Sequence, residues 1–95
     1  NIDNDPKKSG INPNDIQKFF EKFENYNFFP NGIMCIPDIN SDPRESFKNM
    51  NDINQKLLDN YKQYIGELSM GMSSDYKIAL DYGATIIRVG SKIFK

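Results

Sequence analysis

Hydrophobic residues in this chain alternate between stretches with helical spacing and short continuous runs. The first helical stretch follows a polar segment, residues 1–11, and has Asn12 in the N-cap position and Pro13 in the first turn. Asparagine caps the free N–H groups of a first turn, and proline already has the backbone angle that a first turn needs. The spacing therefore predicts a helix that ends within the asparagine-rich segment 25–31 and has one apolar face, formed by Ile16, Phe19, Phe20 and Phe23.

The same signals predict two further helices. Asp42 and Pro43 begin the second, whose apolar residues recur every three or four positions over about six turns: Phe47, Met50, Ile53, Leu57, Tyr61, Tyr64 and Ile65. The third helix covers residues 75–82. Gly83 stands just after its end, where a left-handed backbone favours glycine.

Three short apolar runs are typical of strands. They are residues 32–37, which we expect to form a fully buried strand, residues 67–72 and residues 85–89. Strands that alternate with helices form a parallel sheet with the helices outside it. The pattern therefore predicts an α/β fold.

Composition and charge exclude several function classes. With 12 basic and 13 acidic side chains the net charge is −1, which gives no general attraction for nucleic acid or an anionic membrane. The chain has no histidine, so a Ser-His-Asp triad cannot form from these residues. Cys35 is the single cysteine and cannot form an internal disulfide, and no apolar run is long enough to cross a membrane. We therefore expect a cytoplasmic protein without nucleic-acid or membrane partners.

Both ends of the sequence suggest a longer protein. It begins Asn1-Ile2-Asp3 without a methionine, and it ends at Lys95 directly after a strand-like run. We therefore expect the chain to be a piece of a larger domain.

Candidate anion-binding residues follow the second predicted strand and lie within the third. Ser73 and Ser74 precede the third helix, where free N–H groups and a hydroxyl favour an anion; alternatively, one of these serines only caps the helix. Strand alternation places Arg88 and Ile86 on one face, so the guanidinium is directed into the interior and needs a partner. That partner is either a structural carboxylate or a ligand.

Gly90 and Ser91 follow the third strand and add a freely approachable backbone and a further hydroxyl. The carboxyl ends of neighbouring parallel strands meet at one edge of a sheet, and (β/α)₈ barrels commonly bind phosphate in the loops after strands seven and eight. The pattern therefore favours a phosphate site. The basic turn at residues 7–10 is a weaker candidate, and we interpret its lysines as surface residues.

Several motifs resemble the pyridoxal 5′-phosphate (PLP) homeostasis protein family. The strongest are SMGMSSD at residues 69–75 and RVGSKIF at residues 88–94, with support from KSGI at residues 8–11 and GIMCIP at residues 32–37. That family consists of single barrels similar to the N-terminal domain of alanine racemase. The resemblance implies that residues 1–95 are the C-terminal portion of one TIM (β/α)₈ barrel, about βα units 5–8, with no second domain.

The resemblance also implies roles for individual residues. Ser73 would bind the cofactor phosphate, Gly90 and Ser91 would add donors to it, and Arg88 would face the pyridine nitrogen or the phosphate side of PLP. An arginine stays protonated and keeps a facing ring nitrogen unprotonated, which suits a non-catalytic PLP carrier or regulator of vitamin B6 better than an enzyme. The family's Schiff-base lysine lies on the first strand, and no lysine of this sequence corresponds to it.

Two other functions stay open on the sequence alone. One is a fragment of a fold-type-III PLP enzyme such as an amino-acid racemase, and the other is a phosphate-binding half-barrel that serves in oligomerisation. An open half-barrel would leave strand edges and an apolar inner face without partners. We therefore expect the chain to self-associate or to pair with the missing N-terminal half.

Overall fold

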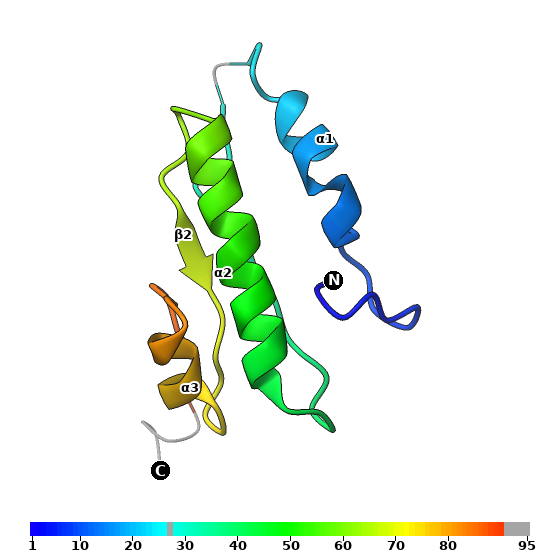
Figure 1. The fold of residues 1–95 in the computed structure, drawn as a ribbon, viewed down its shortest axis with the longest axis vertical. Coiled ribbons are helices and arrows are strands. Elements are labelled where there is room, and N and C mark those ends of the chain that lie inside the picture. The colour runs from blue at the N-terminus through cyan, green and yellow to red at the C-terminus, as the bar shows by residue number, and fades with distance from the viewer. Residues whose placement is uncertain (27, 91–95) are drawn as a thin grey trace.

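The computed structural model describes residues 1–26 and 28–90, in which α2 runs along the long axis and the other elements lie beside it (Figure 1). In chain order the elements are a 3₁₀ turn (Pro13–Asp15), α1 (Ile16–Glu21), β1 (Gly32–Met34), α2 (Pro43–Asn60), β2 (Glu67–Ser69) and α3 (Tyr76–Asp81). The predicted alternation of helices with parallel strands is confirmed. Among the described residues, no helix combines the length and the apolar character that a membrane span requires.

Predicted terminal residues stand at the start of the 3₁₀ turn, at the start of α2 and at the end of α3, whereas α1 ends at Glu21, before the predicted segment 25–31. Asn12 and Asp42 each accept a hydrogen bond from the backbone N–H two residues further on, at 2.9 and 3.0 Å, and a proline follows each of them. Gly83 follows α3 with a φ of +98°, and its N–H donates to the last turn of the helix. These three local predictions are confirmed.

The second helix is shorter than its apolar spacing predicts. α2 ends at Asn60, and Tyr61 is extended, with a φ of −130° and a ψ of 110°. Tyr61 and Tyr64 are nevertheless buried, because both rings pack against Phe20 from α1. The prediction of six turns is therefore wrong: tertiary packing continues the apolar spacing beyond the helix.

β2 is the central strand of the structure. It pairs in parallel with β1, and Gly32 permits this pairing because a Cβ there would lie 2.3 Å from the carbonyl oxygen of Glu67. On the other side of β2, Ile86 donates its N–H to the carbonyl of Leu68 at 3.2 Å and accepts a hydrogen bond from the N–H of Met70 at 3.1 Å. The third predicted strand thus lies beside the second, as the alternating pattern requires.

This third segment departs from regular strand geometry after Ile86. The N–H of Arg88 donates at 3.0 Å to the carbonyl of Gly71, one residue beyond the regular ladder position, and Gly71 has a φ of +105°. One extra residue in a strand interrupts a ladder locally, as in a bulge. Residues 85–89 therefore contribute an isolated bridge to Ser69 instead of the predicted strand.

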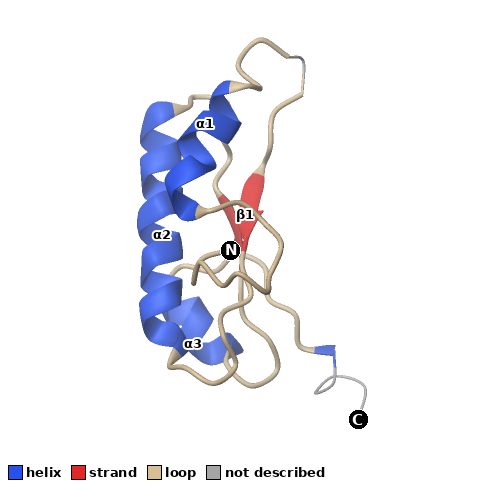
Figure 2. Cartoon of the chain, turned by 90° about the vertical axis from the view of Figure 1, so that its right-hand side faces the viewer, coloured by secondary structure: helices blue, strands red, loops and turns tan. Residues whose placement is uncertain are grey.

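The helices cover one face of the strands and leave the other face open (Figure 2). Side chains of the helices, of β2 and of the connecting segments form two buried clusters. The first contains Cys35, Phe47, Met50, Leu68, Met70 and Ala79. The second contains Phe20, Leu57, Tyr61 and Tyr64. On the opposite face Met34 and Ile86, which pair with Ser69 from its two sides, are 55% and 47% exposed; we call these two residues the helix-free face. The prediction of a fully buried strand at residues 32–37 is therefore wrong, because only its other face is covered.

A buried polar network fixes the connection between α2 and β2. Asn54 is buried, donates from Nδ2 to the carbonyl of Gly66 at 3.0 Å and accepts a hydrogen bond from the hydroxyl of Tyr64. Burial, with a smaller contribution from the carboxylate of Glu67, raises the pKa of Tyr64 to about 12, so this hydroxyl remains a donor at neutral pH. The side chains of Asn54 and Tyr64 thus satisfy each other and the carbonyl of Gly66.

We predict that Asn54→Ala destabilises the protein. The substitution leaves the carbonyl of Gly66 and the hydroxyl of Tyr64 without their partner, which costs about 1–3 kcal/mol for each buried group. Urea denaturation measures this change in the free energy of unfolding. Asn49→Ala is the matched control, since Asn49 is exposed on the same helix; equal losses in the two variants would contradict the role of the network.

Candidate functional site

Arg88 lies at the carboxyl edge of the strands, where its side chain reaches across β2 to β1. Its Nη2 donates to the carbonyl oxygen of Cys35 at 3.2 Å, while its backbone N–H is held by Gly71. Its Nε is buried and has no hydrogen-bond partner among the described residues. The sequence left a structural carboxylate open as the partner of Arg88; in the described part of the chain the partner is a backbone carbonyl instead.

Ser73 lies half-buried in the loop between β2 and α3. This loop and the segment after β1 line a surface hollow of about 510 Å³, whose wall includes Ile36, Met72 and Ser73. Asp75 occupies the position before α3, and its carboxylate accepts a hydrogen bond from the N–H of Met72 at 2.7 Å. Ser73 follows Gly71 by two residues in the sequence, and the carbonyl of Gly71 accepts a hydrogen bond from the N–H of Arg88, whereas Arg88 and Gly90 are not among the residues that line this hollow.

Gly90 lies at an exposed position two residues after Arg88, where an added Cβ would meet no atom of the described residues within 4 Å. Packing within the described residues thus does not require a glycine there. Ser91, the fourth predicted site residue, lies outside the described residues. Three of the four predicted residues therefore lie in the described part of the chain. Ser73 follows β2, and Arg88 and Gly90 follow the bridge at Ile86 beside β2.

Cys35 lies buried beneath this edge, and its thiol is not activated as a nucleophile. Burial raises the pKa of its thiol to about 11; the carboxylate of Asp3 raises it further, whereas the charge of Arg88 opposes this. A thiol that stays protonated at neutral pH is a weak nucleophile. Across residues 1–26 and 28–90, no cluster of His, Cys, Asp and Glu side chains could hold a metal ion.

Two residues of the N-terminal segment reach the same edge without a signal in the hydrophobic pattern. Lys8 donates from Nζ to the carbonyl of Ile36 at 2.7 Å, and Asp3 accepts a hydrogen bond from the N–H of Asp38 at 2.7 Å. Lys8 is partly exposed and this hydrogen bond lies at the surface, so the interpretation as a surface lysine stands, with the carbonyl of Ile36 as its partner. In the sequence, the basic turn at residues 7–10 and the KSGI run at residues 8–11 drew attention to this lysine.

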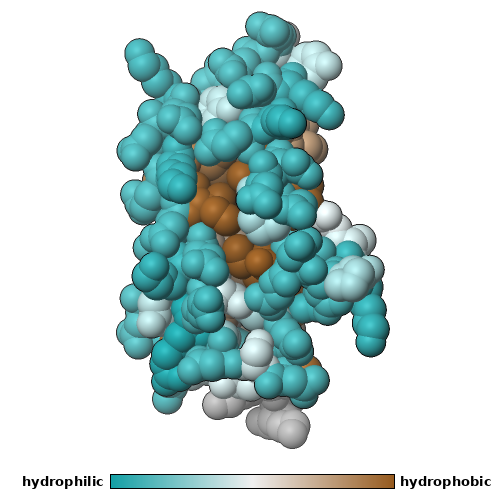
Figure 3. Space-filling model, turned by 45° about the vertical axis from the view of Figure 1, so that its right-hand side comes forward, coloured by the Kyte–Doolittle hydropathy of each residue, from teal (hydrophilic) through white to brown (hydrophobic). Residues whose placement is uncertain are grey.

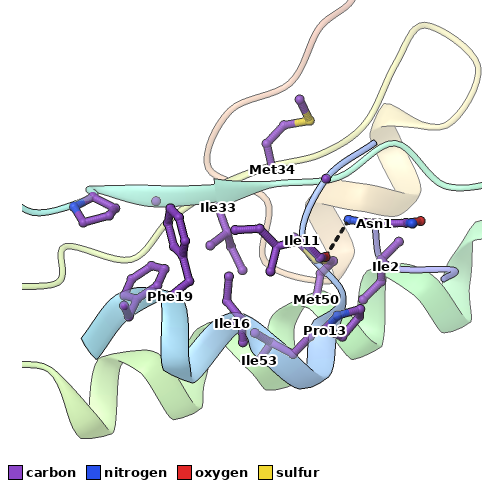
Figure 4. A pocket seen from close by; sticks show the side chains of 14 residues that line it. Asn1, Ile2, Ile11, Pro13, Ile16, Phe19, Ile33, Met34, Met50 and Ile53 are labelled. Atoms are coloured by element: carbon purple, nitrogen blue, oxygen red, sulfur yellow. Dashed lines mark hydrogen bonds between the residues drawn. The ribbon is translucent and has the colours of Figure 1, made fainter. Parts of the chain in front are cut away.

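A second hollow lies on the helix side of β1 and differs in chemistry from the carboxyl edge (Figure 4). It has a volume of about 280 Å³, and no charged side chain lines it. Ile33 points into it and Met34 points away from it, as successive residues of a strand do. On the face shown in Figure 3, hydrophobic atoms form a central patch surrounded by hydrophilic side chains. Among the residues that line this hollow, the N-terminal ammonium of Asn1 is the one charged group, and it donates to the carbonyl of Ile11 at 3.1 Å.

We predict that substitution by alanine destabilises the protein at Gly71 but not at Gly90. Gly71→Ala should lower the free energy of unfolding by about 1–3 kcal/mol, because the φ of +105° disfavours a side chain. The added Cβ would also lie 2.8 Å from the Cβ of Ala79 and 3.1 Å from the Cα of Tyr76. Gly90→Ala should change this free energy little, since its Cβ enters open space. Denaturation curves of both variants provide the measurement, and a stable Gly71→Ala protein would refute the packing argument.

Comparisons with known proteins give one consistent result, although no family model matches the chain. It is 33% identical to a pyridoxal phosphate homeostasis protein of Aquifex aeolicus over 99% of this chain and 43% of the relative. It is 38% identical to the one of Vibrio cholerae, over 99% of this chain and 41% of the relative. The chain therefore spans about two fifths of the length of these curated relatives.

A solved structure agrees with these relatives. The structure of PipY from Synechococcus elongatus, described as without PLP, matches 96% of this chain and 45% of its own, with a TM-score of 0.85 and 31% identity. A protein of Bifidobacterium adolescentis, described as unknown, matches with a TM-score of 0.79 and 29% identity over 96% of this chain and 39% of its own. Over the residues that it spans, the chain belongs to the pyridoxal phosphate homeostasis protein family.

Proposed function

We propose that these residues form the phosphate-holding part of a PLP site in a non-catalytic protein of intracellular PLP homeostasis. In this proposal residues 1–95 are the C-terminal portion of a TIM (β/α)₈ barrel, about βα units 5–8, and the loops after β2 and after residue 88 correspond to those after strands seven and eight. The lysine that would bind the cofactor covalently lies outside these residues. Family membership and the position of Arg88 support the proposal.

One observation carries the proposal: the guanidinium of Arg88 is not satisfied by the described part of the chain. Arginine has five N–H donors and stays protonated, so a buried Nε without a partner is costly. Among residues 1–26 and 28–90, the side chain has one recorded hydrogen bond, to the carbonyl of Cys35, and its Nε has none. An anionic or acceptor group of a ligand would supply what this site lacks.

The surrounding residues suit a phosphorylated cofactor. We assign Ser73 and Ser91 as hydroxyl donors, Gly90 as the position where the backbone approaches the phosphate, and Arg88 as the residue that faces the pyridine nitrogen or the phosphate side. The open space around the position of a Cβ at Gly90 supports this assignment, because a ligand can come close there. When bound, PLP supplies a pyridine ring that can act as an electron sink.

The identity of the charged residue favours binding over turnover. An arginine beside the ring nitrogen remains protonated and keeps that nitrogen unprotonated, which weakens the electron-sink chemistry of the ring. The cofactor would then be held without being activated. This is the chemistry expected of a carrier or regulator of vitamin B6.

We also propose that the helix-free face pairs with another surface, either a second copy of this chain or the N-terminal half of the barrel. Met34 and Ile86 are about half exposed there, at 55% and 47%. Within the described residues β1 pairs with β2 alone, so its outer edge has no strand partner. An apolar face beside an unpaired edge favours association.

We predict that Arg88→Gln in the natural full-length protein weakens PLP binding. Loss of a charge-assisted hydrogen bond costs about 1.5–3 kcal/mol, or roughly ten- to hundredfold in affinity. Isothermal titration with PLP measures the effect. Arg44→Gln is the matched control, because Arg44 is exposed and forms its ion pair with Asp42 on the surface.

Two results would contradict this function. Unchanged PLP affinity in Arg88→Gln would remove the role of Arg88. Racemase turnover by the full-length protein would replace a homeostasis role with that of a PLP enzyme.

We predict that the 95-residue chain by itself is not a monomer at micromolar concentration. Size-exclusion chromatography should give a dimer or a larger species, and Met34→Asp should shift it toward the monomer by charging the helix-free face. Ile39→Asp is the control, since Ile39 is 91% exposed and lies in the loop after β1. A well-folded monomer of the unchanged chain would count against self-association.

A further inference from the structure

The segment after β1 is held by side chains from both ends of the chain. Arg88 binds the carbonyl of Cys35 at 3.2 Å, and Lys8 binds the next carbonyl, that of Ile36, at 2.7 Å. Two residues further on, Asp3 accepts a hydrogen bond from the N–H of Asp38 at 2.7 Å. Three charged side chains thus fix a loop whose own internal hydrogen bonds involve only Asp38, Asn40 and Ser41.

Lys8 differs from the two acidic residues at this edge, Asp3 and Asp75, because it has donors that no group of the described residues is recorded to bind. Asp3 also accepts a hydrogen bond from the hydroxyl of Ser46, and the carboxylate of Asp75 holds the N–H of Met72. Both acids are therefore engaged with donors of the protein. Lys8 has an ammonium with three donors, and one hydrogen bond of this ammonium, to Ile36, is recorded within the described residues.

The position of this bond relates Lys8 to the candidate anion site. Ile36 lines the same hollow as Ser73, and the preceding residue, Cys35, is the partner of Arg88. The carbonyls of Cys35 and Ile36 belong to successive planar peptide units that share the Cα of Ile36, so a displacement of the chain at Ile36 displaces both units. The guanidinium of Arg88 would then lose its single recorded side-chain partner.

We propose that Lys8 is a positioning residue of the candidate anion site: it holds the carbonyl of Ile36, and so keeps the segment after β1 in the place where Arg88 faces a phosphate. This inference deepens the proposed function and rests on it for the identity of the ligand. Lys8 acts through the carbonyl of Ile36 and through the ordering of the loop. The N-terminal segment thereby becomes part of the site's support.

The test uses the natural full-length protein with Lys8→Met, which removes the ammonium and keeps an unbranched side chain. Amide hydrogen exchange of residues 36–41 without ligand should be about tenfold faster in this variant, and affinity for inorganic phosphate should fall severalfold. Lys8→Arg should restore both, because it can still donate to the carbonyl of Ile36. Lys7→Met is the control, since Lys7 is exposed and lies next to Lys8.

The two measurements distinguish a positioning role of Lys8 from a general effect of surface charge and from failure of the proposed function. Unchanged exchange at residues 36–41 in Lys8→Met overturns the positioning role. Equal losses of phosphate affinity in Lys7→Met and Lys8→Met with unchanged exchange would indicate a general effect of surface charge and would also overturn it. If the unchanged protein binds neither phosphate nor PLP, the proposed function fails, while the exchange measurement still decides whether Lys8 holds the segment.

Discussion

The parallel pairing on both sides of β2 is the constraint on which the rest of the structure depends. Leu68 and Met70 are fully buried against the helices, and their backbone groups bind the segment that contains Ile86. Arg88 reaches the carbonyl of Cys35 because β1 and the bridge at Ile86 flank β2 in register. A slip of one residue would exchange the two faces of a strand and move the guanidinium to the helix side. The candidate site is thus a consequence of strand register.

Local signals in the sequence predicted the start of the 3₁₀ turn, the start of α2 and the end of α3. Asn12 and Asp42 cap their helices through hydrogen bonds that span two residues, so a short window of sequence contains all the necessary groups. The end of α2 could not be predicted in this way. Tyr61 and Tyr64 keep an apolar spacing because they meet Phe20 in the tertiary structure, and that contact has no local signature.

The candidate site shows the same division between local and distant contacts. Strand alternation identified Arg88 as an inward-directed cation, and the small residues around Gly71 and Gly90 marked the loops beside it. The hydrogen bonds of Lys8 and Asp3 join residues 28 and 35 positions apart, and their acceptor and donor are backbone groups that every residue has. A backbone partner leaves no mark in the amino-acid pattern, so these contacts required the structure.

The residues at this edge differ in whether the described fold explains them. Gly71 is explained by packing, since any side chain there would collide with α3, and Asp75 is explained by the turn that it closes. Arg88 and Gly90 are not explained in this way: the first is a buried cation with an unpaired Nε among the described residues, and the second faces open space. A residue that lowers the stability of the fold, or contributes nothing to it, is expected at a site that binds a ligand. In this chain those two residues lie two positions apart on the segment beside β2, which is why we place the phosphate there and not in the apolar hollow behind β1.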